Sequence, residues 1–420
     1  MKGATLMRTT TKLASLAAAT IGNLAQGAPA PTKYQITSMT LVNLGSLYDN
    51  PSESEATDIN DLGDVVGWSW DHTTHARPMI HLNGQMYFLN PSEWPGLSSS
   101  TATSINNNRL VVGKYVWNST PVRGFYYYPG IWMTDLASNG HGLGFAWTLA
   151  ANSVNNQGVI VGEGKIIDPP GLPDAPDTTG ICYTDWLPMY WSSAGQNPQA
   201  LFCYPDPDQD NQGFVGVRPA ANEINDSGDI VGTDGGRTTY AMFLKRNSQS
   251  PVGVPKPAGS PAGLFGSANS ISNTGLVVGT YGYSTDTTKY PASPLRAFIW
   301  DGSSTSSTSL GVLPGGTWSV GEGVNNQDMV VGTSERDERY SGVGRSGFIY
   351  HSDFGMLRLP SPTVSGLHVR ITECRAVAIN NRKSNGLVQV AGTCAFNEIG
   401  VTAVRWDIQV AQVQLLPVSQ

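Results

Sequence analysis

Aromatic residues are concentrated between positions 115 and 147 of this 420-residue chain. Such rings can stack on the faces of sugars while nearby amides hydrogen-bond the sugar hydroxyls. Alternate residues of a strand face opposite sides, so half of Phe125–Tyr128 should belong to a core. The candidates for glycan contact are therefore the residues in or near loops: Trp117, Asn118, Trp132 and Trp147. The alternative is that these rings pack only against neighbouring strands.

Catalytic motifs of the common hydrolase classes do not occur in the sequence. The six histidines show no H-E-x-x-H spacing, and no G-x-S-x-G nucleophile elbow is found. A site assembled from distant segments would leave no such motif. A glycan lyase or hydrolase needs a proton donor, a base and a charge-stabilising group. The candidates for such a trio are Arg123, Tyr128 and His141.

An acidic run is a third candidate site, because Asp206, Asp208 and Asp210 alternate with other residues. Calcium is bound by several oxygen ligands, which such a run can supply. The run departs from the EF-hand loop, since Asn211 and Val217 occupy the positions of its turn glycine and last glutamate. A solvated acidic turn is the alternative. Apart from calcium, we expect no cofactor.

The N-terminus has the features of an export signal. Basic residues precede a short alanine-rich apolar segment, residues 13–25, and small residues allow cleavage after Gly27. We therefore assign residues 1–27 to a signal peptide, 28–38 to a linker and 39–420 to the folded domain. No other segment approaches 18 consecutive apolar residues, so no membrane span is predicted. The protein is expected to be secreted, periplasmic or on the cell surface.

The four cysteines of an exported chain are expected to form two disulfides. Among the possible pairings we favour Cys182–Cys203 and Cys374–Cys394. The second pair flanks two short β segments joined by a turn, and a hairpin would place the two cysteines opposite each other. Four free, buried thiols are the alternative.

Composition narrows the classes of partner. The chain has 25 basic and 32 acidic residues, a net charge of −7, and only 14% charged residues. Binding to nucleic acid needs clustered Lys and Arg, so no nucleic-acid partner is expected. The 11 Trp, 16 Tyr and 11 Phe argue against a disordered chain. A large, turn-rich, all-β protein remains, which we expect to be a monomer.

One phrase, A-x-x-I-N-x-x-G-x-V-V-G in its full form, recurs seven times and defines the repeats. Its Asn and first Gly suit a tight turn, its paired valines suit a strand buried on both faces, and its last Gly indicates a close backbone approach. The phrases begin at Ala56, Ala102, Ala151, Ala221, Ala268, Gly321 and Ala376. Arg109 and Asp328 replace the turn glycine in two phrases, and the last phrase carries extra residues. We expect other turn geometries in these three.

Further apolar segments follow the phrases and give about four short strands per repeat. Repeats of ~40–55 residues with four strands are typical of β-propeller blades. The sequence therefore predicts an all-β, seven-bladed β-propeller with four-stranded antiparallel blades in a closed ring. Counting Met39–Leu47, the outermost segment has eight copies for seven blades, so one terminal copy should complete the last blade and the other should lie outside the ring. The sequence does not say which copy does so, and an open solenoid is the alternative.

The phrase, followed by RAFIWDG at Arg296–Gly302, resembles the HAF family of bacterial extracellular repeats. That family is named for a His-Ala-Phe stretch, which this chain shows as Arg-Ala-Phe at 296–298 and as His75-Ala76. The resemblance covers about residues 39–416. It implies an exported repeat protein and is uninformative about activity.

Three functions stay open, because a fold does not determine a function. The first is a secreted binding module for a glycan or an extracellular protein. The second is a polysaccharide-degrading lyase or glycoside hydrolase with its active site at a channel mouth. The third is a structural protein of the cell surface. An exposed tryptophan surface would favour binding, whereas an arginine converging with a His or Tyr would favour the enzyme.

Overall fold

The computed structural model describes residues 32–47, 53–73, 75–89, 97–118, 122–136, 145–167, 186–202, 219–234, 241–248, 250–260, 265–283, 295–335, 344–362, 371–397 and 400–414. Within these ranges every regular element is a β-strand. The prediction of an all-β chain is confirmed.

Five sheets have four strands each, and the strands pair in the order in which they follow along the chain. The first contains β2 (Ser54–Ile59), β3 (Val65–Trp70), β4 (Ala76–Leu82) and β5 (Gln85–Phe88). The second contains β6 (Leu97–Ile105), β7 (Val111–Trp117), β8 (Arg123–Tyr127) and β9 (Thr134–Asp135). The third contains β10 (Phe145–Val154), β11 (Ile160–Ile167), β12 (Trp186–Trp191) and β13 (Gln199–Ala200). The fourth contains β14 (Ala220–Ile224), β15 (Ile230–Thr233), β16 (Ala241–Leu244) and β17 (Val252–Gly253), and the fifth contains β18 (Phe265–Ile271), β19 (Val277–Tyr283), β20 (Arg296–Trp300) and β21 (Thr308–Gly311).

An eight-stranded sheet holds the last two repeats. Its strands are β22 (Ser319–Val324), β23 (Val330–Glu335), β24 (Arg345–His351), β25 (Gly355–Arg358), β26 (Ile371–Ile379), β27 (Leu387–Phe396), β28 (Gly400–Gln414) and β1 (Thr32–Gly45). A single parallel pair, Arg345 with Glu373, joins a four-stranded group of the sixth repeat to one of the seventh. Apart from that pair the strands are antiparallel, so the prediction of four-stranded antiparallel units is confirmed.

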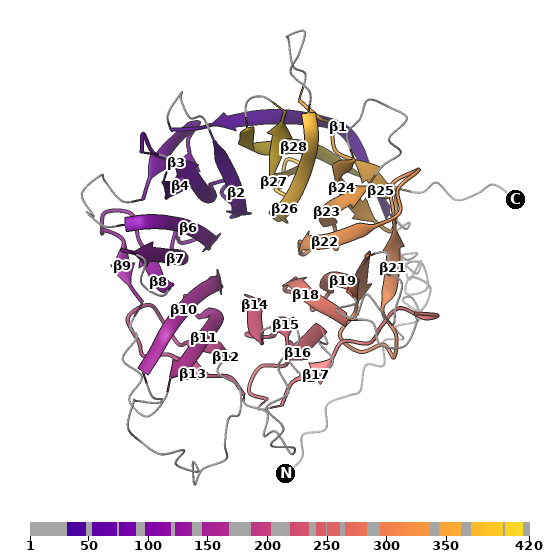
Figure 1. Ribbon diagram of the computed structural model, residues 1–420. Helices are drawn as coiled ribbons and strands as arrows, with labels where there is room; N and C mark the ends of the chain where they lie inside the picture. Colours follow the sequence, from indigo (N-terminus) through magenta and orange to yellow (C-terminus); the bar gives the residue numbers. More distant parts are fainter. Residues whose placement is uncertain are drawn as a thin grey trace, which may run out of the picture.

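The sheets are arranged around a common centre, toward which the first strand of each repeat points (Figure 1). Each first strand contacts the first strand of the next repeat, and β2 also contacts β26, β27 and β28. The first and last repeats of the chain are therefore neighbours in space.

The N-terminus supplies the fourth strand of the last repeat. β1 pairs with β28 from Thr32 opposite Gln414 to Gly45 opposite Ala403. Because β28 is one continuous strand, the C-terminal apolar segment extends the third strand of this repeat and does not form a fourth. The N-terminal copy of the outermost segment is thus the one that completes the group, and β1 begins inside residues 28–38, the range assigned to a linker.

The paired valines are buried on both faces, as predicted. Val65 and Val66 are both 0% exposed, and they face opposite sides of the first sheet. Val65 belongs to an apolar cluster with Ala391 of the last repeat, and Val66 to one with Val111 of the second. Full burial of one such side chain contributes about 1.5–3 kcal/mol. Since each core is shared between neighbouring sheets, a single repeat could not bury its own apolar faces.

A β-bulge interrupts the first strand of every repeat at the second residue of the phrase, which is Thr57 in the first repeat. The bulge pushes the Glu55 carbonyl oxygen so close to Gly67 that a methyl group there would collide with it. The same collision would occur at Gly113, Gly162, Gly232, Gly279, Gly332 and Gly392. The predicted close backbone approach is confirmed at all seven closing glycines.

The prediction of different turn geometries is wrong for two of the three exceptional phrases. Arg109 and Asp328 adopt φ values of 61° and 58°, in the left-handed region that Gly63 occupies in the first turn. The N–H of each donates to the asparagine carbonyl three residues earlier, as the N–H of Gly63 does. Contacts to neighbouring repeats, described below, offset the cost of a side chain in this conformation. The last turn does differ: its Asn380 N–H bonds to Gln389 across the extra residues.

The disulfide predicted between Cys374 and Cys394 is present, with Cα atoms 4.1 Å apart. The two residues are directly opposite in the register of β26 and β27, as a hairpin requires.

The signal peptide, residues 1–27, and the pairing Cys182–Cys203 lie outside the described residues, as do His141 and Asp206, Asp208 and Asp210. Within the described part of the chain, no helix has the length and apolar character needed to cross a membrane.

Candidate functional site

A polar pocket of about 140 Å³ lies at the centre, lined by the ends of the first strands and the turns that follow them. Every repeat contributes to it, from Asp58–Asp61 in the first to Ile379–Asn381 in the last. Amides and carboxylates dominate the lining, and none of the described residues that line it is Lys or Arg. The turns of the repeat phrase are therefore both structural elements and the wall of a site.

The first residue of each turn bonds within its own turn, and where it is asparagine its amide also bonds to the next repeat. Asn60 Oδ1 accepts the N–H groups of Leu62 and Asp64 at 3.1 and 3.0 Å, and Asn60 Nδ2 donates to the Asn106 carbonyl at 3.2 Å. The same amide-to-carbonyl bond joins Asn106 to Asn155, Asn155 to Asn225, Asn225 to Ser272, Asn325 to Asn380 and Asn380 to Asn60, at 2.9–3.2 Å. Ser272 keeps its turn by accepting from the Leu276 N–H at 3.1 Å, but it has no amide to donate onward.

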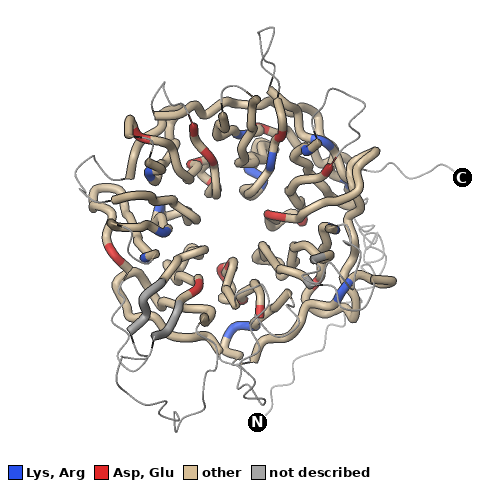
Figure 2. Tube along the Cα trace, viewed as in Figure 1, with Lys and Arg blue, Asp and Glu red and all other residues tan. Residues whose placement is uncertain are grey.

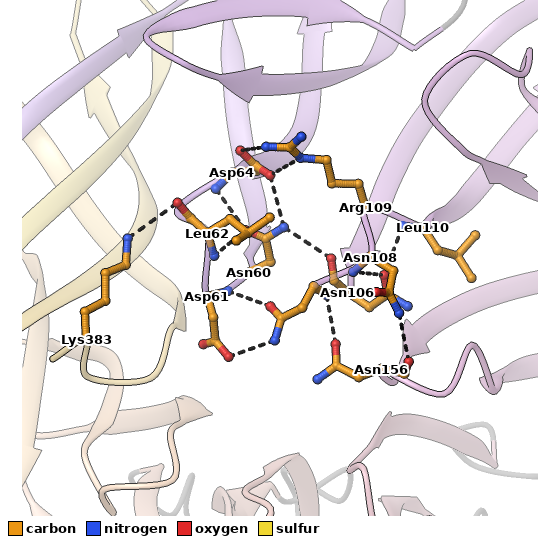
Figure 3. A network of polar contacts seen from close by, with 11 residues as sticks. Asn60, Asp61, Leu62, Asp64, Asn106, Asn108, Arg109, Leu110, Asn156 and Lys383 are labelled. Atoms are coloured by element: carbon orange, nitrogen blue, oxygen red, sulfur yellow. Dashed lines mark hydrogen bonds and ion pairs between the residues drawn. The ribbon is translucent and has the colours of Figure 1, made fainter.

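The second residue of each turn belongs to a cycle of hydrogen bonds. The backbone N–H of each donates to the side-chain Oδ1 of its counterpart in the next repeat, and Figure 3 shows the part of this cycle that runs from Asp61 toward Asn156. The seven bonds measure 2.7–2.8 Å and run from Asp61 to Asn107, Asn107 to Asn156, Asn156 to Asp226, Asp226 to Asn273, Asn273 to Asn326, Asn326 to Asn381 and Asn381 to Asp61. The last bond returns to the first turn.

An ion pair supports the exceptional turn of the second repeat. Arg109 Nε lies 2.7 Å from Asp64 Oδ2 of the first repeat, and Asn60 Nδ2 donates to the same oxygen at 3.2 Å (Figure 3). Asp64 is 5% exposed, so the pair is partly shielded from water. In the sixth repeat, Asp328 Oδ1 accepts from Thr274 Oγ1 at 3.1 Å. These contacts between repeats hold two non-glycine residues at positive φ.

Two carboxylates on the first strands face the pocket and have perturbed acidity. Asp58 Oδ2 accepts the Ile105 N–H at 2.8 Å, and Glu223 Oε2 accepts the Ile271 N–H at 3.3 Å. Burial raises the pKa of Asp58 to about 6. Burial, with a smaller contribution from the charge of Asp58, raises the pKa of Glu223 to about 8. At neutral pH Glu223 is therefore a proton donor and Asp58 is mostly ionised. Figure 2 shows that acidic residues lie near the centre on several strands.

Exposed apolar residues lie at the asparagine end of the sheets, by which we mean the end where the first strand turns into the second. Because Val111 pairs with Tyr127, β8 ends beside the turn of the second repeat. The turn that follows β8 exposes Ile131 by 54% and Trp132 by 66%, and Leu62 in the first asparagine turn is 54% exposed. The asparagine end thus combines a polar pocket with exposed apolar side chains.

The four predicted glycan contacts are not gathered in one place. Trp117 ends β7 at the opposite end of the second sheet from Trp132, since Tyr115 pairs with Arg123 there. Trp117 is half-buried and packs against the core between the first and second sheets, and Asn118 next to it is exposed. Trp147 lies within β10, and its side chain is outside the described part of the structure. Of the two tryptophans in this set whose side chains the structure describes, Trp132 is largely exposed, at 66%, and Trp117 is half-buried.

Arg123 and Tyr128 of the predicted catalytic trio are also separated. Arg123 begins β8 and pairs with Asp135 at 3.8 Å, and Asp135 also accepts the Tyr115 hydroxyl. Tyr128 follows the other end of β8 and packs against the core between the second and third sheets. The register of the strand therefore keeps Arg123 and Tyr128 apart. Among the described residues, no group of three or more His, Cys, Asp or Glu side chains is placed to hold a metal ion.

The pocket acids are functional candidates that the sequence patterns above did not single out. Asp58 and Glu223 occupy the third position of the phrase, where Ser104, Ser153 and Ser270 stand in other repeats. A carboxylate replacing serine at one repeated position was the available signal.

No protein-family model matches this chain, and no curated protein matches it. Among solved structures, a protein of unknown function from Dyadobacter fermentans DSM 18053 aligns over 90% of this chain and 100% of its own, with 10% identity and a TM-score of 0.40. The sialidase of Trypanosoma rangeli aligns over 89% of this chain and 60% of its own, with 10% identity and a TM-score of 0.39. The lectin BP39L from Burkholderia pseudomallei aligns over 89% and 96%, with 14% identity and a TM-score of 0.40. Likeness at this level indicates neither substrate nor activity, so function has to be argued from the site.

Proposed function

We propose that this chain is an exported, closed, seven-bladed β-propeller that binds a neutral or basic glycan at its asparagine end. The observation that carries the proposal is the 66% exposure of Trp132 at the same end of the sheets as a pocket lined by amides and carboxylates. The face of an exposed indole suits the apolar face of a sugar, and amide and carboxylate oxygens accept hydrogen bonds from its hydroxyls.

The seven-unit closed architecture is supported by the cycle of hydrogen bonds and by the pairing of β1 with β28. Seven repeat phrases provide the seven turns of the cycle, and its last bond joins Asn381 to Asp61. The pairing of β1 with β28 leaves the last four-stranded group complete. A ring of this kind would give the asparagine turns one common side, on which a glycan could reach both Trp132 and the pocket.

The absence of Lys and Arg from the described pocket lining supports the choice of glycan. Asp58, Asp61, Glu223 and Asp226 are all in the lining. The negative charge of the aspartates would repel uronate, sulfate or sialate groups and favour neutral sugars or protonated amino sugars.

A glycan array containing neutral, amino and acidic glycans tests the proposal, with the wild-type protein and Trp132→Ala compared on the same spots. We expect wild type to retain a neutral or amino glycan and Trp132→Ala to bind it at least tenfold more weakly, about 1.4 kcal/mol. Tyr87→Ala is the matched control, because Tyr87 is another exposed aromatic residue, at 43%, on the outer strand β5. Equal binding by wild type and Trp132→Ala, or no retained glycan, contradicts the proposal.

A second candidate function is hydrolysis of a glycan, favoured by the paired acids of the pocket. Glycoside hydrolases use one protonated and one ionised carboxyl group, whose environments separate their pKa values. Glu223 and Asp58, with pKa values of about 8 and about 6, meet that description. The test is release of reducing ends from neutral polysaccharides. We expect Glu223→Gln to lose at least a hundredfold in rate while retaining binding, and no product with wild type would reject hydrolysis of those substrates.

A further inference from the structure

Side-chain hydrogen bonds at the β-bulge join five of the repeats to the next repeat along the chain. In five repeats the second residue of the phrase donates to the carbonyl oxygen of the first residue of the next phrase. The bonds run from Thr57 to Ala102, Thr103 to Ala151, Asn152 to Ala221, Asn222 to Ala268 and Asn269 to Gly321, at 2.7–3.0 Å. Every donor in this series is a hydroxyl or an amide, so none of the bonds depends on pH.

The sixth repeat has Glu322 at this position. The strand β22 bulges between Gly321 and Gly323, as the other first strands do, and Gly323 lies directly against the backbone of Val377 and Ala378 in β26. The side chain of Glu322 interacts electrostatically with Arg375, the residue before Ala376. Glu322 thus holds the position from which five other repeats reach this carbonyl, which here belongs to Ala376 on the adjacent strand β26.

A carboxylate has no hydrogen to donate, whereas a carboxylic acid has one. We infer that Glu322 is held as the neutral acid in the folded protein and that its O–H donates to the Ala376 carbonyl oxygen. This bond would extend the series across the sixth junction, between β22 and β26.

The surroundings of Glu322 favour its neutral form. Burial raises its pKa to about 7, and the positive charge of Arg375 opposes this only in part. Arg375 is itself paired with Glu373 at 2.6 Å, which reduces its effect on Glu322. The side chains that bond to β22 from the preceding sheet are uncharged: Asn269 and Ser270 on β18 and Thr280 on β19.

The sixth junction depends on Glu322 more than the other junctions depend on the equivalent residue. In five repeats the third residue of the phrase accepts a backbone N–H of the next first strand: Asp58, Ser104, Ser153, Glu223 and Ser270. Gly323 has no side chain with which to accept such a bond. Ionisation of Glu322 would remove the donor and place a negative charge against a carbonyl oxygen, so the junction should weaken as pH rises through about 7.

Glu322→Gln and Glu322→Leu test this inference by urea denaturation at pH 5 and pH 8. The folded-state pKa is raised above the ordinary 4.5, so the stability linked to the proton is present below 4.5 and lost as pH rises through about 7. Glutamine keeps a donor at every pH. We expect wild type and Glu322→Gln to match at pH 5, and the unfolding equilibrium constant of wild type to be at least tenfold larger than that of Glu322→Gln at pH 8.

Glu322→Leu removes both the proposed hydrogen bond and the ionisable group. At pH 5, where Glu322 of wild type is neutral, it therefore measures the contribution of the hydrogen bond alone. The leucine variant should be less stable than wild type at pH 5. Residue 322 should cause no further loss of stability at pH 8, because leucine does not ionise. Hydrogen exchange of Ala376–Ile379, compared between wild type and Glu322→Gln at pH 8, should be at least tenfold faster in wild type. The inference is overturned if Glu322→Gln keeps the pH dependence of wild type, or if Glu322→Leu matches wild type at pH 5. The comparison of wild type with Glu322→Gln decides alone if the leucine variant does not fold.

Discussion

The backbone N–H of Asn381 donates to Asp61 Oδ1 at 2.8 Å, although the two residues are 320 positions apart in the chain. Asn381 Nδ2 also donates to Asp61 Oδ2 at 3.1 Å, and Asn107 Nδ2 donates to the same oxygen at 2.8 Å. One carboxylate thus holds the last repeat, the first and the second together. The ends of the repeat array are joined at the central pocket as well as by the outer strand β1.

Replacing Asp61 with alanine should destabilise the protein by about 2–4 kcal/mol, because three hydrogen bonds to one carboxylate are lost together. Chemical denaturation measures the change. Asp226→Ala is a matched control, since Asp226 accepts the corresponding bonds from Asn156 and Asn273. Only Asp61→Ala should speed hydrogen exchange of the Asn381 amide, and an unchanged rate there would contradict the role assigned to Asp61.

Stability should fall as pH rises toward 8, in part through Glu223. Burial raises the pKa of this acid from 4.5 to about 8, so the stability linked to its proton is fully present below pH 4.5 and is lost as pH rises through about 8. Glu223→Gln should therefore flatten this part of the pH profile and gain about 1–3 kcal/mol over wild type above pH 8. Denaturation across a pH series checks it, and parallel profiles for the two proteins would rule out a buried proton at Glu223.

Asp328→Gly and Arg109→Gly should have opposite effects, although both restore glycine to the same position of the turn. Each relieves about 1 kcal/mol of backbone strain at positive φ. Asp328 gives up one hydrogen bond to Thr274, on the surface, and should gain up to about 1 kcal/mol. Arg109 gives up its 2.7 Å pair with the buried Asp64 and should lose stability. Thermal denaturation of both variants decides the point, and stabilisation of both would show that the ion pair contributes nothing.

Removing the disulfide with Cys374→Ala and Cys394→Ala together should cost about 3 kcal/mol, as expected for a closed loop between cysteines with a sequence separation of 20. Denaturation of the double variant and of reduced wild type measures the cost. With reductant present for both, the two should unfold at the same denaturant concentration, because the expected bond between Cys182 and Cys203 is then open in both. If reduction leaves the unfolding midpoint of wild type unchanged, the bond does not contribute to equilibrium stability.

Features set by local pattern could be predicted from the sequence. The alternation around Val65 and Val66, the closing glycines and the spacing of Cys374 and Cys394 each depend on one strand or one hairpin. Positive φ at Arg109 and Asp328 could not be predicted, because the contacts that offset its cost come from other repeats.

The candidate site depended still more on the arrangement of distant segments. Trp117 and Trp132 are close in sequence, but strand register places them at opposite ends of one sheet. Asp58 and Glu223 are three repeats apart, and they share a pocket because the first strands point toward a common centre (Figure 1). Motif spacing carries no information on such a meeting, although the substitution of acid for serine within the phrase does mark both positions.

The pairing of β1 with β28 sets a condition on the order in which this chain can fold. β1 is synthesised first, yet its partner is among the last strands made, so its edge has no native partner until nearly the whole chain is available. Pairing across such a separation is slow, since a long loop must close before any bond is gained. Completion of the last sheet should therefore be a late kinetic step, during which a second chain could donate its own N-terminal strand instead. Linking the two ends by circular permutation would make this pairing local and remove that opportunity for strand exchange.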